Sequence, residues 1–102
     1  MISLTFDILP VAKQDIVSYG DYLAERDISV AWRFADAVDA MIEMLCRNPE
    51  LGERLHADST GQIRYRTISG FANYLIFYRR VDFVLEIVRI LHGARDYEQF
   101  FE

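Results

Sequence analysis

The spacing of apolar residues changes along this chain, and that change predicts its fold class. Residues 3–8 alternate apolar and polar side chains, which is the period of a half-buried strand. Segments 11–25 and 29–47 place apolar residues at helical spacing, and three later segments, 63–68, 74–79 and 84–91, are rich in β-branched and aromatic residues. The order β-α-α-β-β-β predicts an α+β fold in which a helical hairpin packs on a C-terminal antiparallel sheet.

The two helices have recognisable ends and faces. Pro10 suits a first helical turn, Ser29 is the expected N-cap of the second helix, and Asn48-Pro49 is its expected stop. On the first helix we expect an apolar stripe to face the core, made of Ala12, Ile16, Tyr19 and Leu23. The acidic residues Asp15, Asp21 and Glu25 should face solvent. Residues 50–61 lack a sustained period and are rich in turn formers, so we expect a loop there.

Chain length, the single cysteine and the lack of targeting or ligand motifs restrict the class of protein. A chain of 102 residues predicts one domain, 1–102, and a single cysteine, Cys46, excludes an internal disulfide and indicates a reducing compartment. The sequence shows no leader pattern and no apolar run long enough for a membrane span, so we expect a cytoplasmic protein without a membrane contact. No metal-ligand spacing or cofactor motif is present, and we expect neither a metal nor a cofactor.

The net charge of −5 is unevenly distributed along the chain. Residues 63–95 carry a charge of +4, whereas the residues before them carry −6 and the last seven carry −3. Period-two alternation places Arg64 and Arg66 on one face of their strand; it groups Leu75, Phe77 and Arg79 on the next strand and Leu85, Ile87, Arg89 and Leu91 on the last. If the helices cover one face, some of these arginines should project from the other, either toward an acidic partner or phosphates, or only toward solvent.

Two further side chains are candidates for function. Trp32 falls on the polar side of its helix, where an exposed ring would anchor an interface. The loop 50–61 or the chain terminus could instead fold over the Trp32 ring, and a covered ring is the alternative that we favour. His92 ends the last strand and could act as an acid or base, although a structural hydrogen bond there is the expectation we favour.

Taken in order, these features resemble the ParE branch of the RelE/ParE superfamily of toxins from type II toxin–antitoxin systems. The similar stretches run along almost the whole chain: Leu9-Pro10-x-Ala12 with Asp15-Ile16 and Tyr19, Ala31-x-Arg33-Phe34 with Ile42, Pro49-x-Leu51-Gly52, Tyr74-x-Ile76-x-Tyr78-Arg79, and Ile87-x-Arg89-Ile90-Leu91-His92-Gly93-Ala94-Arg95-Asp96. The last stretch is the most specific of them.

The resemblance implies a plasmid-stabilisation toxin that binds and inhibits DNA gyrase and is neutralised by a cognate antitoxin. On this basis we expect a protein inhibitor rather than an enzyme, with these partner-binding residues: Trp32, Arg64, Arg66, Arg79, Arg89, His92, Arg95, Tyr97, Phe100 and Phe101.

Two alternatives remain open. The relatives that cut mRNA on the ribosome use basic side chains with a tyrosine or histidine, for which the candidates here would be Arg64, Arg66, Arg89, His92, Arg95 and Tyr97. The single lysine, Lys13, lies in the first helix, and the net negative charge disfavours direct nucleic-acid binding. A non-toxic homologue that only binds its antitoxin is the other alternative.

Overall fold

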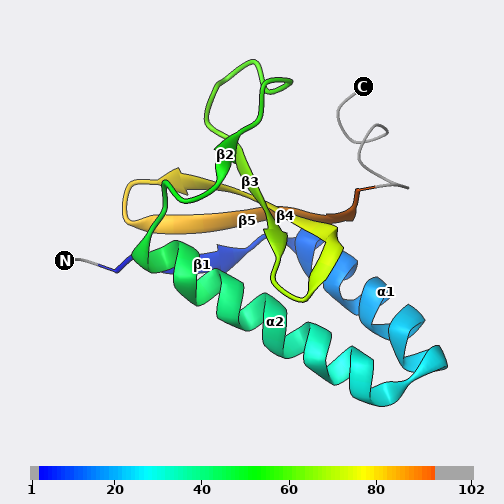
Figure 1. The fold of residues 1–102 in the computed structure, drawn as a ribbon. Helices are drawn as coiled ribbons and strands as arrows, with labels where there is room; N and C mark the ends of the chain where they lie inside the picture. Colours follow the sequence, from blue (N-terminus) through cyan, green and yellow to red (C-terminus); the bar gives the residue numbers. More distant parts are fainter. Residues whose placement is uncertain (1–2, 94–102) are drawn as a thin grey trace.

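The computed structural model describes residues 3–93 and arranges them in two layers (Figure 1). The first layer is a hairpin of two helices, and the second is a sheet with strand order β1-β5-β4-β3-β2. The elements are β1 Thr5–Ile8, α1 Pro10–Arg26, α2 Ile28–Arg47, β2 Glu53–Arg54, β3 Arg64–Ile68, β4 Phe71–Val81 and β5 Val84–His92. The α+β class and the order β-α-α-β-β-β are confirmed, with β2 as a two-residue addition.

Strand β2 lies inside the segment 50–61 that was expected to be a loop. Its two residues pair antiparallel with β3, Glu53 opposite Tyr65 and Arg54 opposite Arg64. A strand of two residues is too short to show alternation in the sequence, so its pairing depends on the loop bringing it beside β3.

The helices follow the predicted ranges within one or two residues, but the cap of α2 differs from the prediction. Asp27 is the N-cap, and its carboxylate accepts hydrogen bonds from the backbone N–H and the hydroxyl of Ser29, at 2.9 and 2.7 Å. Ser29 is therefore inside the helix, and assigning it as the cap was wrong. The aspartate two residues earlier holds an extended backbone and is the better acceptor for the free N–H groups of the first turn. These bonds from Ser29 lower the pKa of Asp27 below its ordinary value.

Strands β3, β4 and β5 form the antiparallel meander, with shorter turns than predicted. Gly70 with φ 85° and Asp82 with φ 53° provide the left-handed backbone that these tight reversals require. Strand β1 adds parallel to β5, so the complete sheet is mixed rather than purely antiparallel.

Apolar side chains fill both sides of the sheet. The main core lies between the sheet and the helices, where Phe34, Ile42 and Leu45 of α2 pack with Ile76 and Tyr78 of β4. A second cluster, which we call the outer cluster, lies on the other face: Leu55, Phe77 and Leu91 with Ile63, Tyr65, Leu75 and Val88. The sheet face away from the helices is therefore apolar around these residues.

An irregularity in β5 changes which of its residues face the helices. Tyr78 pairs with Ile87 and Phe77 with Arg89, so Val88 is an extra residue. Such a bulge reverses the alternation beyond it. Leu85 and Ile87 face the main core, whereas Leu91 belongs to the outer cluster. The prediction that Leu85, Ile87, Arg89 and Leu91 share one face was therefore wrong.

Candidate partner-binding surface

A hydrogen-bonded loop at the end of α2 organises the basic end of the sheet. The backbone N–H of Gly52 donates to the Tyr78 hydroxyl at 2.8 Å, and that hydroxyl donates to the Pro49 carbonyl at 2.9 Å. Burial raises the pKa of Tyr78 above its ordinary value. The Pro-x-Leu-Gly segment and the tyrosine of β4, which the sequence presents as separate motifs, therefore form one structural unit.

Arg64 and Arg66 hold the other side of the same loop. Arg64 Nη1 donates to the carbonyls of Gly52 and Glu50, at 2.8 and 3.3 Å, and Arg66 Nη1 donates to the Leu51 carbonyl at 3.2 Å. Both arginines lie in register with core residues of β4 and share the face that the helices cover. The sequence did not assign which of the sheet arginines project from the opposite face; on β3 the alternation places Tyr65 there instead of these two.

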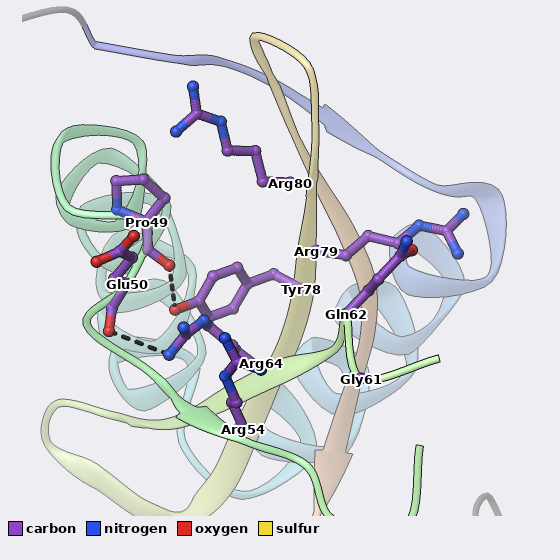
Figure 2. A pocket seen from close by; sticks show the side chains of 9 residues that line it. All are labelled: Pro49, Glu50, Arg54, Gly61, Gln62, Arg64, Tyr78, Arg79 and Arg80. Atoms are coloured by element: carbon purple, nitrogen blue, oxygen red, sulfur yellow. Dashed lines mark hydrogen bonds between the residues drawn. The ribbon is translucent and has the colours of Figure 1, made fainter. Parts of the chain in front are cut away.

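The two arginines that follow Tyr78 diverge. Arg79 Nε donates to Glu86 Oε1 at 2.7 Å across the β4–β5 hairpin. Arg80 Nε donates to the Asp82 carbonyl at 2.8 Å, and its side chain is exposed. A pocket of about 220 Å³ opens between this hairpin and the loop (Figure 2). Its lining is Pro49, Glu50, Arg54, Gly61, Gln62, Arg64, Tyr78, Arg79 and Arg80.

Arg89 pairs in register with Phe77 of the outer cluster, and its side chain is bound by α1 at the free edge of β5. Its Nε and Nη2 donate to the two carboxylate oxygens of Asp15, at 2.8 and 3.0 Å, and the Ile90 N–H donates to the same carboxylate at 3.0 Å. The Asp15 side chain is 12% exposed, so the expectation that it faces solvent is wrong. Strand β1 pairs with β5 only as far as Ile87, and Asp15 provides the acceptor that the free edge of β5 needs beyond that point.

His92 is held at the end of β5 by two tyrosines. Its backbone N–H donates to the Tyr19 hydroxyl at 2.9 Å, and its ring meets the Tyr74 ring edge-on, with centroids 5.1 Å apart. Its Nδ1 is buried and makes no hydrogen bond with the part of the chain described here. The ring is therefore a packing element of the helix–sheet contact.

Trp32 is exposed on α2. Its side chain is 69% accessible, so neither the loop 50–61 nor any other described segment covers it. Ile28, one helical turn before it, is 56% accessible. An aromatic ring beside an aliphatic side chain on an otherwise polar helix face is typical of an interface.

The remaining predicted residues, Arg95, Tyr97, Phe100 and Phe101, lie outside residues 3–93, so the structure does not place them. Within the described residues no helix is long and apolar enough to cross a membrane, and no group of His, Cys, Asp or Glu could hold a metal ion.

The structure also assembles residues that the sequence did not single out. Arg54 and Gln62, from the segment around β2, line the same pocket as Arg64. In the sequence, Arg54 is an isolated arginine within the segment 50–61 that was expected to be a loop, and no pattern there marks it as part of a site. Its role depends on a two-residue strand pairing that no local pattern encodes.

Residues 6–97 match the model of one protein family, described as the ParE toxin of the type II toxin–antitoxin system parDE. No curated protein matches the chain. The match covers most of the chain and agrees with the observed element order. The chain belongs to the ParE toxin family of type II toxin–antitoxin systems.

Proposed function

We propose that this toxin binds DNA gyrase directly and inhibits it, and that a cognate antitoxin neutralises the toxin by docking on it. The chain would act as a single domain in the cytoplasm, where its target lies, and would contribute to plasmid stabilisation. Membership of the ParE toxin family supports the antitoxin partner, whereas the choice of gyrase rests on the following observations.

The observation that carries the proposal is the engagement of the arginines. A ribonuclease needs cationic side chains free to polarise a scissile phosphate. Here Arg89 is bound by Asp15, and Arg66 donates to the Leu51 carbonyl of the loop after α2. The sheet face away from the helices carries the apolar outer cluster, and Arg89, which pairs in register with Phe77 of that cluster, is bound by Asp15. A protein target is the better match for this distribution.

The helical hairpin supplies a surface for a protein partner. Trp32 and Ile28 together present an apolar ridge on α2, and Asp36 is exposed one turn beyond. We propose that the antitoxin docks on this ridge and that residues 92–101 contribute to the gyrase contact.

A direct binding measurement tests this proposal. Purified toxin is immobilised and titrated with the gyrase subunits, with and without the product of the adjacent gene. We expect saturable binding that the adjacent product abolishes. Absence of gyrase binding together with cleaved transcripts in expressing cells would instead establish the mRNA endonuclease. Normal growth on induction together with binding to the adjacent product alone would establish a non-toxic homologue.

A further inference from the structure

The pocket beside Tyr78 gathers positive charge that the fold does not balance. Four arginines and one glutamate are among its lining residues. The charge of Arg79 is compensated by Glu86, and Glu50 can balance one more. Two positive charges therefore lack a carboxylate partner within the described part of the chain.

The sheet places two of these charges directly opposite each other. Arg54 of β2 pairs in register with Arg64 of β3, which in turn pairs with Tyr78 of β4. Figure 2 shows the Arg54 and Arg64 side chains together below the Tyr78 ring, and both residues line the pocket. Like charges opposite each other across two strands destabilise the pair, and an anion between them would remove that repulsion.

The two arginines differ in how they are fixed. Arg64 is held by the carbonyls of Gly52 and Glu50, so its guanidinium has a defined position with further N–H groups unused. Arg54 is exposed, and no described residue forms an ion pair or side-chain hydrogen bond with it. Arg80 lines the pocket from the β4–β5 side and uses only Nε, for the Asp82 carbonyl. One fixed and two adaptable arginines thus line one pocket; in Figure 2 the Arg80 guanidinium points away from those of Arg54 and Arg64, so it must turn inward to share an anion with them.

We propose that this pocket is a binding site for a phosphate group, held by Arg54, Arg64 and Arg80. A phosphate monoester carries a charge of about −1.5 to −2 at neutral pH, which matches the two unbalanced positive charges. Guanidinium groups present paired N–H donors that fit its oxygens. The phosphate is either free or the terminal group of a small phosphorylated molecule such as a nucleotide. The site lies apart from the proposed antitoxin ridge at Trp32 and does not depend on the identity of the toxin's target.

Thermal unfolding in different anions tests the site. A ligand that binds only the folded state raises the melting temperature, and for a site of millimolar affinity 10 mM phosphate should raise it by about 7 °C for a domain of this size. Inorganic phosphate and a nucleoside monophosphate are the two probes, each compared with chloride at equal ionic strength. An equal shift from both assigns the site to phosphate itself, and a larger shift from the nucleotide assigns it to a phosphorylated small molecule. No shift from either probe overturns the proposal.

Variants locate the effect within the fold. Arg54→Gln and, separately, Arg80→Gln should fold normally, because both side chains are exposed, and should lose most of the phosphate-dependent shift. Arg54→Gln should in addition melt at or above the wild-type temperature in chloride, since it removes the repulsion with Arg64. Arg33→Gln changes an exposed arginine on α2 and should retain the full shift. A phosphate shift that survives in both pocket variants, or that is lost equally in Arg33→Gln, would contradict the proposal.

Discussion

The backbone of Gly52 lies against the hydroxyl of Tyr78 so closely that no side chain fits between them. A Cβ on Gly52 would lie 2.5 Å from the Tyr78 oxygen and 2.8 Å from the Tyr65 carbonyl oxygen. The same Gly52 N–H donates to that hydroxyl, so the contact and the hydrogen bond share one geometry. This relationship ties the end of α2 to the centre of the sheet.

Gly52→Ala should therefore destabilise the protein, because backbone of β3 and a buried ring must both move. We expect a loss of about 1–3 kcal/mol in the free energy of unfolding, measured by chemical denaturation. Gly20→Ala is the matched control: nothing lies within 4 Å of its added Cβ, and a helical alanine should stabilise by up to about 1 kcal/mol. If both substitutions changed the free energy of unfolding equally, the close contact between Gly52 and Tyr78 would not contribute to stability as described.

The Asp15–Arg89 ion pair makes a second prediction about stability. Asp15→Ala removes a bidentate partner and leaves the Ile90 N–H without its acceptor, which should cost about 1–3 kcal/mol. Asp15→Asn retains an acceptor and should recover part of the loss. Asp21→Ala, at an exposed position on the same helix, should change stability by less than about 0.5 kcal/mol. If Asp15→Ala unfolds like Asp21→Ala in denaturant, the edge-capping role is wrong.

The loop between β2 and β3 should respond to acid. The Asp58 carboxylate accepts from the Thr60 hydroxyl and from the N–H groups of Thr60, Gln62 and Ile63, and these bonds, led by the Thr60 hydroxyl, lower its pKa from 3.8 to about 2. Because the folded pKa is below the unfolded one, this contribution to stability is present above about pH 4 and is lost as the pH falls toward 2.

An NMR titration checks this prediction. The Asp58 side-chain carbon and the Ile63 amide should titrate together with a midpoint near 2. In Asp58→Asn the Ile63 amide should no longer respond in this range. A midpoint near 3.8 for wild-type Asp58 would mean that the loop bonds do not persist in solution.

The helices and strands could be predicted because the spacing of apolar residues that identifies them lies within each segment of the sequence. The positions of the arginines in the candidate surface could not be predicted in this way. Helix α1 was expected at 11–25 and is observed from Pro10 to Arg26, since Pro10 and the apolar stripe are read directly from the sequence. The face of Arg64 and Arg66 could not be assigned, because alternation groups residues without saying which group the helices cover. The bulge at Val88 and the pairing of Arg54 with Arg64 depend on contacts between strands, which leave no local signature.

Trp32 gives a prediction for the antitoxin. The substitution Trp32→Ala should change the free energy of unfolding by less than about 0.5 kcal/mol, because the ring is 69% exposed. It should weaken binding of the adjacent gene's product by about thirtyfold or more, as expected for an aromatic anchor. Met44→Ala, at a less exposed position on the same helix, should bind normally. Titration calorimetry measures both, and unchanged affinity in Trp32→Ala would move the docking site elsewhere.

Inhibition of DNA gyrase is the central claim, and a supercoiling assay with purified toxin tests it most directly. Relaxed plasmid, gyrase and ATP are incubated with increasing toxin, and the product of the adjacent gene is added in a parallel series. We predict that supercoiling falls as toxin rises and returns when that product is present in excess. Normal supercoiling at saturating, correctly folded toxin would contradict the account.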